Sequence, residues 1–449
     1  MTALERDSRL SGRRKEDPRS PFERDRDRIL HCSAFRRLAG VTQVVDPAEG
    51  QVFHNRLTHS LKVAQIARRL AERLLREQPE ECEALGGLSP DVVETAALAH
   101  DLGHPPFGHV AEAKLHKLVV ANKGEGFEGN AQSFRIVTKL ALKKPAKFGL
   151  DLTLASLNAI LKYPWLRDPQ GPKKKKAKWG AYETEHAAFD AAQEIAPNPG
   201  TRTLEAEVMN ISDDIAYAVH DLEDFFRAGL IPLEILWSEE ISTAPEGEEG
   251  ENRLVTGERL RFLEKALLHW RQRDEKVDPE ECSRVLEDLM GILPPMSGRY
   301  QGSRSQRVAL RQAISALIGR YVGAVRVDTT KPGVAFDERH QVYELEIALL
   351  KQLTWQYVIM NPALGAQQHG RAHVIEELFR IYFEAWDSED WNHIVPPAFR
   401  ARTDPDGTPV PPVRRVADIV SSFTDFEALA MYRRLTGHSA DSLLPARGW

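Results

Sequence analysis

Cysteine, long apolar runs and β-strand patterns are all scarce in this chain of 449 residues. Its three cysteines, Cys32, Cys82 and Cys282, lie far apart and form no CxxC pair, so we expect neither a disulfide framework nor a cysteine-based zinc site. No apolar run reaches the roughly 18 residues that a membrane-spanning helix needs. The N-terminal residues also lack the apolar segment of a secretory signal, which predicts a cytoplasmic protein with no membrane partner.

The overall composition is that of an ordinary globular protein. Hydrophobic residues make up 42% of the chain and the formal net charge is −6, which excludes a wholly disordered chain. The length allows about three domains or one large helical unit. No strong alternating strand pattern occurs, whereas most segments repeat their apolar residues with a helical period. The predicted fold class is therefore all-α.

The helical period is clearest in residues 60–75 and 204–226, where apolar side chains recur on one face. Another helix begins near residue 89, where a serine is followed by proline and aspartate. It ends at Gly103, because the two prolines that follow cannot continue it. Further helices are predicted at about 257–273, 305–325, 340–358, 372–386 and 415–436.

Polar segments suggest how the chain is organised. Residues 1–28 are predicted to form a partly mobile arm, residues 29–230 a core domain and residues 231–449 a helical C-terminal region with additional helices. Loops or insertions rich in Pro, Gly or like charges are predicted at 167–180, 243–253 and 388–413.

The run Lys173–Lys176 suggests single-stranded nucleic acid as a partner. A solvated loop is the favoured interpretation, because the net charge is negative and no nucleic-acid motif accompanies the run. Nucleic acid is kept as the less favoured alternative.

Histidine is plentiful where cysteine is not. A metal site in this chain would therefore use imidazole and carboxylate ligands rather than thiolates. Six of the 15 histidines lie in one short stretch of sequence: His54, His59, His100, His104, His109 and His116.

His100 and Asp101 end an otherwise apolar helix. Burying a carboxylate without a partner is costly, and a bound metal ion would supply that partner. His59 begins an earlier amphipathic helix, and Asp213 and Asp214 interrupt an apolar helix face. One His, one His-Asp pair and one later Asp provide nitrogen and oxygen ligands together. This mixture suits Mn, Fe, Co, Ni or Zn better than an all-oxygen Mg or Ca site.

Each part of this pattern has a simpler explanation when it is taken alone. His59 could cap a helix, and Asp213 could be a surface acid. The order His, His-Asp, Asp on three helices is much more specific than an isolated HD dipeptide, so the metal interpretation is favoured.

Seven blocks follow one another over most of the first half: PFERDRDRILHCSAFRRLAGVTQV (21–44), HNRLTHSLKVAQIARRLA (54–71), ALAHDLGHPPFGHVAEAKL (97–115), GFEGNAQSFRIV (126–137), LKYPW (161–165), KWGAY (178–182) and SDDIAYAVHDLED (212–224). In these residues and this order the chain resembles the HD-domain deoxynucleoside triphosphate triphosphohydrolases of the bacterial deoxyguanosinetriphosphatase-like type. The second half matches only through short pieces such as 311–322 and 431–437.

The resemblance implies a helical enzyme that hydrolyses a dNTP to the deoxynucleoside and inorganic triphosphate. It also implies a homo-oligomer, a tetramer or hexamer, and a divalent metal cofactor such as Mn, Mg, Co, Fe or Zn. Residues 29–230 would form the phosphohydrolase core, and the C-terminal region would complete the active-site cleft and the subunit interface. The implied metal ligands are His59, His100, Asp101 and Asp213, with Asp214 the less favoured member of the Asp pair.

Cleavage at the α-phosphorus requires a proton for the departing 5′ oxygen. A histidine backed by a carboxylate can donate it, and His109 with Glu112 three residues later fits this requirement. The family uses the same dyad. We favour the acid role for His109, although the sequence leaves a base role open. His104 is predicted to contact phosphate or support the catalytic residues.

Four substrate contacts are predicted, and Arg371 is a candidate for a fifth. Arg56 precedes His59 by three residues and, by resemblance, binds phosphate. Tyr217 follows Asp213 by one helical turn and so should face the same cavity. The resemblance implies that Tyr217 packs on the deoxyribose, although a core aromatic is the simpler alternative. By resemblance Asp221 and Gln43 bind the 3′-hydroxyl, and Arg371 is the candidate for the γ-phosphate arginine.

Two other functions compete with this one. The HD ligands alone would equally fit another HD phosphohydrolase, such as a nucleotidase, a phosphodiesterase or a single-strand exonuclease. A nucleic-acid-binding regulatory protein with a degenerate HD fold is the other alternative, and the complete ligand set argues against it. The preferred base and any activation by a second nucleotide are left open.

Overall fold

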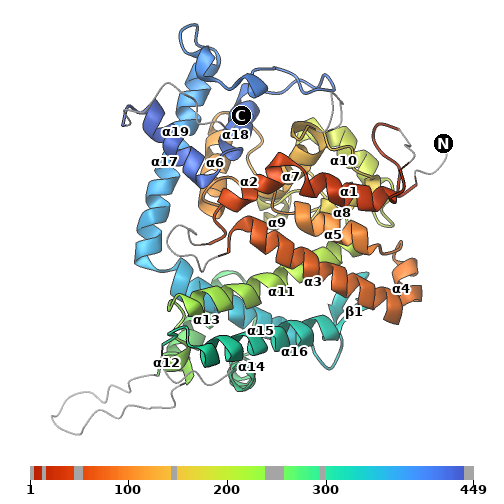
Figure 1. The fold of residues 1–449 in the computed structure, drawn as a ribbon, viewed down its shortest axis with the longest axis vertical. Helices are drawn as coiled ribbons and strands as arrows, with labels where there is room; N and C mark the ends of the chain where they lie inside the picture. Colours follow the sequence, from red (N-terminus) through yellow and green to blue (C-terminus); the bar gives the residue numbers. More distant parts are fainter. Residues whose placement is uncertain are drawn as a thin grey trace, which may run out of the picture.

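The structure is a computed structural model that describes residues 5–12, 17–44, 54–142, 149–237, 257–293 and 299–438. Within these residues nearly all the regular secondary structure is helical, which confirms the all-α prediction (Figure 1). The helices are α1 (Pro21–Leu30), α2 (Ser33–Arg37), α3 (Arg56–Glu77), α4 (Pro79–Ala84), α5 (Pro90–Ala99), α6 (His109–Ala121), α7 (Gly129–Arg135), α8 (Leu154–Ile160), α9 (Lys173–Ala177), α10 (His186–Gln193), α11 (Leu204–Arg227), α12 (Leu233–Trp237), α13 (Glu258–Gln272), α14 (Pro279–Ile292), α15 (Arg304–Ala324), α16 (Val342–Thr354), α17 (Pro362–Trp386), α18 (Pro412–Ser421) and α19 (Asp425–Leu435).

The structure bears on two scarcities of the sequence, cysteine and long apolar runs. The three cysteines are free and buried. Among the described helices, none combines the length and the apolar composition that crossing a bilayer would require.

Helices α3, α5 and α11 pack against one another at the centre, and α1 and α8 cover α5. Seven of the ten residues of α5 are buried, because nearly all its side chains are uncharged. The residue that directly follows α5, His100, is consequently delivered into the interior, where it is 4% exposed.

Two hydrophobic clusters hold the helices together. The larger joins the central helices to α13–α16, and the smaller joins α6 to α17, α18 and α19. Helix α17 runs along one side of the molecule between these two groups (Figure 1). The predicted domain boundary after residue 230 stays a prediction, because both clusters draw residues from each side of it.

Part of the predicted N-terminal arm is anchored to the core. Arg9 is buried, and its Nη1 donates a hydrogen bond to Asp25 Oδ1 at 2.7 Å. Asp25 Oδ2 accepts in turn from the Thr153 backbone N–H at 2.7 Å. The acidic segment 243–253, predicted to be a loop, lies outside the described residues.

A short hairpin departs from the helical pattern. Strands β1 (Val325–Asp328) and β2 (Gly333–Phe336) pair antiparallel, with Val325 opposite Phe336. The sequence alternates at Val325 and Val327 before a turn, but four-residue strands are too short for periodicity to separate them from a helix end.

The prediction of one helix at 415–436 is wrong, because this segment forms two helices, α18 and α19. Helix α19 begins after Thr424, whose hydroxyl accepts from the Glu427 N–H at 3.2 Å. The Glu427 carboxylate accepts from the Thr424 N–H at 2.8 Å. This reciprocal capping box starts a new helix where a periodic pattern suggests a continuous one.

A buried ion-pair cluster joins the first half of the chain to the C-terminal region. Arg135 Nη1 lies 2.6 Å from Glu185 Oε1 and 3.0 Å from Asp404 Oδ2. Its Nη2 lies 2.9 Å from Asp418 Oδ2. Burial opposes the charged form, but the surrounding carboxylates raise the pKa of the Arg135 guanidinium well above its ordinary value. The Arg135 cation and the carboxylates around it therefore stabilise one another in a site without solvent access.

We expect Arg135→Ala to lower the free energy of unfolding by about 3–5 kcal/mol, because it removes the cation of the buried Glu185 and leaves Asp404 and Asp418 with Arg415 alone. Denaturant unfolding followed by circular dichroism measures the loss. Arg380→Ala is the control, since Arg380 pairs with Glu377 and Glu384 on an exposed face of α17, where such pairs contribute roughly 0–1 kcal/mol. Equal losses of unfolding free energy in the two variants would show that the buried cluster stabilises the fold no more than a surface ion pair does.

Candidate metal and phosphohydrolase site

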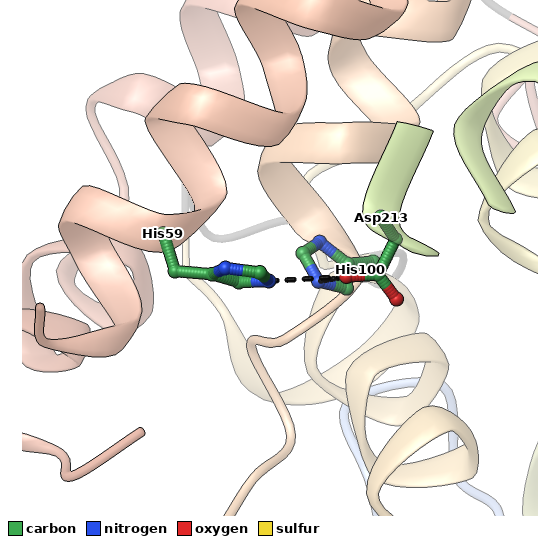
Figure 2. Close-up of side chains that lie close together, drawn as sticks. All are labelled: His59, His100 and Asp213. Atoms are coloured by element: carbon green, nitrogen blue, oxygen red, sulfur yellow. Dashed lines mark hydrogen bonds and ion pairs between the residues drawn. The ribbon is translucent and has the colours of Figure 1, made fainter. Parts of the chain in front are cut away.

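Three helices bring His59, His100 and Asp213 together (Figure 2). His59 lies in the first turn of α3, His100 directly follows α5, and Asp213 lies within α11. One potential ligand atom from each residue lies within 4.8 Å of the other two. His59 Nε2 is 3.0 Å from Asp213 Oδ1, and His100 Nε2 is 3.6 Å from the same oxygen. Two imidazole nitrogens and a carboxylate at this spacing could hold a divalent metal ion.

The backbone of α5 orients His100. Its Nδ1 lies 2.7 Å from the Ala97 carbonyl oxygen and donates to it, while its Nε2 faces Asp213. A hydrogen bond on one ring nitrogen is the usual device that fixes the tautomer and orientation of a metal-binding histidine. The donor set and its support therefore both fit a metal ion.

Asp101 lies at the edge of this group. Its Oδ1 is 3.5 Å from His100 Nε2 and 3.0 Å from His104 Nδ1. Its Oδ2 accepts a hydrogen bond from Arg56 Nη1 at 2.8 Å. Burial opposes ionisation, but these neighbouring groups hold the pKa of Asp101 well below its usual range. The structure thus gathers three of the four predicted ligands into one group and places the fourth beside it as an anion.

The two members of the Asp213-Asp214 pair have different partners. Asp213 Oδ1 faces the histidines, and its Oδ2 accepts a hydrogen bond from Lys162 Nζ at 2.7 Å. Asp214 instead accepts from Lys351 of α16 at 2.6 Å, and its side chain is 44% exposed. Of the two acids, Asp213 is the one placed with His59 and His100.

Two lysines lie at the site that the sequence patterns do not single out. Lys162 contacts Asp213, and Lys178 Nζ lies 2.9 Å from Glu112 Oε1 and 3.0 Å from Glu128 Oε1. Burial opposes the charged forms, but these carboxylates raise the pKa of both ammonium groups. Both lysines lie in blocks that carry the resemblance. Their partners, more than 45 residues away in sequence, could not be identified from local spacing.

A second group joins His104, His109 and Glu112, whose potential ligand atoms also lie within 4.8 Å of one another. His109 is the first residue of α6, and its Nδ1 is 2.9 Å from Glu112 Oε2. The His109 side chain is 69% exposed, whereas Glu112 is buried. Burial opposes ionisation of Glu112, but His109 and Lys178 hold its pKa well below the usual range.

His104 connects the two groups. It meets Asp101 on one side, and its ring lies edge-on to that of His109, with 5.3 Å between ring centres. Burial, together with the Arg56 cation, lowers the pKa of His104 to about 4. At neutral pH His104 is therefore an uncharged imidazole that can make hydrogen bonds without adding positive charge.

Three of the predicted substrate contacts hold a buried polar atom with no hydrogen-bond partner among the described residues. These atoms are Arg56 Nη2, Gln43 Oε1 and Asp221 Oδ2. Most buried polar groups in folded proteins are hydrogen-bonded, so each of these atoms has capacity left for a ligand. Arg56 is otherwise fixed, since its Nε donates to the Thr42 carbonyl oxygen at 3.1 Å.

Tyr217 and Asp221 follow Asp213 on α11 at intervals of one helical turn, which places them on the same face of the helix. Tyr217 is half-buried and Asp221 is 5% exposed. Burial, with Asp224 and Asp213 nearby, raises the pKa of Asp221 well above its ordinary value. A protonated carboxyl group can donate a hydrogen bond as well as accept one, which suits a hydroxyl partner.

Arg371, the predicted γ-phosphate contact from the C-terminal region, lies on α17. It is 8% exposed, and its guanidinium lies 5.3 Å from the centre of the Phe107 ring. Phe107 directly precedes the turn into His109, so Arg371 borders the loop that carries this histidine.

His54 and His116, the other two histidines of this stretch of sequence, are partly buried. His54 contacts the Asp224 carboxylate through both its backbone N–H and its ring. His116 lies beside Trp179, and its Nδ1 is 3.2 Å from the Phe127 carbonyl oxygen.

A cavity of about 550 Å³ lies away from these residues, between α2, α18 and α19. Its walls include Arg36, Phe399, Phe426 and Met431, and it contains none of the predicted ligands, catalytic residues or substrate contacts. A search for cavities alone would therefore not locate the site formed by the two histidine groups.

Comparison with known proteins gives two family matches. Residues 56–218 match the HD domain, and residues 338–434 match the phosphohydrolase-associated domain. HD domains bind divalent metal ions, and the first match contains both groups of potential ligands described above.

Curated relatives cover most of the chain. A Streptomyces coelicolor deoxyguanosinetriphosphate triphosphohydrolase-like protein is 36% identical over 444 residues, which is 94% of each chain. A protein of the same name from Corynebacterium efficiens is 36% identical over 386 residues, covering 82% of this chain and 80% of the relative. Another from Rhizobium meliloti is 31% identical over 439 residues, covering 94% and 90%. These matches extend into the second half, where the motif blocks are few.

Proposed function

Because the chain belongs to the HD-domain phosphohydrolase family of deoxyguanosinetriphosphate triphosphohydrolase-like proteins, we propose that it hydrolyses a deoxynucleoside triphosphate to the deoxynucleoside and inorganic triphosphate. One observation carries the proposal: the Asp101 carboxylate meets three functional groups at once. It lies 3.5 Å from His100 of the metal group, 2.8 Å from the predicted phosphate ligand Arg56, and 3.0 Å from His104 of the second histidine group. A metal, a phosphate and a proton donor would thus act within one site.

The metal ligands are proposed to be His59, His100 and Asp213, with Asp101 beside them. A divalent ion held there would polarise a phosphoryl oxygen and lower the pKa of an attacking water. Mn, Mg, Co, Fe and Zn are the proposed ions, and the two imidazole nitrogens favour a transition metal among them.

His109 is proposed to protonate the departing 5′ oxygen. Hydrolysis at the α-phosphorus leaves the water oxygen on the triphosphate and requires a proton on the nucleoside. His109 suits this step because its ring is exposed and its Nδ1 is held by Glu112. The ionised Glu112 would orient the imidazole through this contact. The neutral His104 would support the phosphate or His109 by hydrogen bonding.

Besides Arg371, three cations at or beside the two ligand groups would meet a triphosphate. Arg56 offers Nη2, and Lys162 and Lys178 lie at the two ligand groups. Lys162 pairs with one carboxylate and Lys178 with two, and because an ammonium group has three N–H donors, each would keep at least one for a phosphate oxygen. The local field of these groups, rather than the bulk charge of −6, would attract a polyanion.

The sugar contacts are proposed to be Tyr217, Asp221 and Gln43. Tyr217 would pack on the deoxyribose and disfavour a 2′-hydroxyl, and the unpaired oxygens of Asp221 and Gln43 would meet the 3′-hydroxyl. The homo-oligomer and the single-stranded nucleic acid partner stay predictions.

The test is to incubate the purified protein with each dNTP and rNTP, with Mn²⁺ or Mg²⁺, and to separate the products by ion exchange. Inorganic triphosphate and deoxynucleoside are the expected products, and rNTPs are expected to react poorly. Monophosphate with pyrophosphate would overturn the proposed reaction. Cleavage of single-stranded DNA without nucleotide turnover would favour the exonuclease alternative.

A further inference from the structure

The first residue of α19, Asp425, contacts two segments of the candidate site from the other end of the chain. Its Oδ1 accepts a hydrogen bond from the Phe107 N–H at 2.8 Å. Its Oδ2 accepts from the Thr42 N–H at 3.1 Å and also from the Thr42 hydroxyl. Asp425 is 7% exposed, so these three bonds are sheltered from water.

The first segment leads directly into His109. Phe107 and Gly108 both have positive φ angles, 65° and 64°, before α6 begins. This conformation is unfavourable for phenylalanine, so the surroundings must hold it. A side chain added at Gly108 would lie 3.1 Å from Arg56 Nη2, which shows how closely this turn approaches the arginine. The bond from Asp425 fixes the backbone of this turn.

The second segment supports Arg56. The Thr42 carbonyl oxygen accepts from Arg56 Nε at 3.1 Å, while Arg56 Nη1 donates to Asp101. Gln43, a predicted sugar contact, is the next residue after Thr42. Asp425 therefore holds the peptide that orients Arg56 and carries Gln43.

A role in starting α19 does not account for these contacts. The N-cap of α19 is Thr424, and its capping box is completed by Glu427. Both Asp425 oxygens point instead to backbone groups 318 and 383 residues away in sequence. We propose that Asp425 is a positioning residue through which the phosphohydrolase-associated region sets the relative placement of His109 and Arg56.

This role rests on the proposed function, and the test is built on Asp425→Asn in the full-length, metal-loaded protein. The amide keeps the side-chain volume but turns an N–H donor toward Phe107 or Thr42. We expect kcat to fall by roughly 10- to 100-fold, the scale expected of a misplaced catalytic group. We also expect faster hydrogen–deuterium exchange at the Thr42 and Phe107 amides and unchanged metal content. Glu427→Ala is the matched control, since it weakens the cap of α19 without touching either segment, and its kcat should stay near the wild-type value.

Several results would overturn the proposal: a wild-type kcat in Asp425→Asn, a lower kcat with unchanged exchange at both amides, or an equal loss in Glu427→Ala. If Asp425→Asn does not fold, Thr42→Val removes one of the three bonds and should lower kcat in the same direction. A wild-type kcat in that variant would count against the proposal. If the wild-type protein hydrolyses no dNTP, the proposed function fails. The exchange measurement, which needs no substrate, still decides whether Asp425 holds the two segments.

Discussion

Asp213→Ala is expected to lose both the bound metal ion and turnover. Asp213 is the carboxylate that approaches His59 and His100, and its second oxygen is held by Lys162. Loss of a residue that merely supports a metal ligand weakens binding by about 10- to 100-fold, and loss of a ligand itself should cost at least as much. Metal content after gel filtration, measured by plasma mass spectrometry, gives the first result, and triphosphate release gives the second.

Asp214→Ala is the matched control for this experiment. The two acids are adjacent in sequence and have the same charge, but Asp214 contacts Lys351 on a partly exposed face. We expect Asp214→Ala to keep its metal and most of its activity. Asp213→Asn retains the side-chain volume beside Lys162, and its thermal melt tests for a general loss of fold. Wild-type metal content in both Asp213 variants would show that the ligand assignment is wrong.

The spacing of the histidines and acids was informative because each lies at a defined position on a helix. His59 lies in a first turn, His100 at a helix end and Asp213 on an interior face, so helical periodicity fixes where each one points. When α3, α5 and α11 pack together, these positions converge. Local patterns could therefore predict the group, although they could not show that Asp101 lies at its edge.

The lysines and Asp425 show where local patterns fail. Lys162 pairs with an acid of α11 and Lys178 with an acid of α6, and only the folded arrangement of the helices brings these partners together. Asp425 reaches Phe107 across 318 residues. The periodicity of residues 415–436 predicts one continuous helix and so gives no sign of the helix start that presents Asp425. Long-range pairs of this kind carry no signal in the periodicity of a single segment.

His109→Ala is expected to keep the metal and lose most of the rate. His109 is not part of the group formed by His59, His100 and Asp213, so its removal leaves those residues intact. Removal of a positioned general acid lowers kcat by roughly 10²- to 10⁴-fold. The control is His186→Ala, because His186 Nδ1 meets Glu183 at 3.1 Å in a comparable but exposed pair. A near-normal rate in His109→Ala would remove this residue from the mechanism.

A second substrate separates the acid role of His109 from the base role. The second substrate is an analogue in which a phenol of low pKa replaces the deoxynucleoside as the leaving group. Its phenolate oxygen needs little protonation as it departs. If His109 is the acid, His109→Ala should lose much less activity with this analogue than with a dNTP. If His109 instead activates the attacking water, both substrates should lose activity by the same factor. Glu112→Gln should follow the same pattern with a smaller loss, because Glu112 orients His109, while Lys178 keeps Glu128 as its partner.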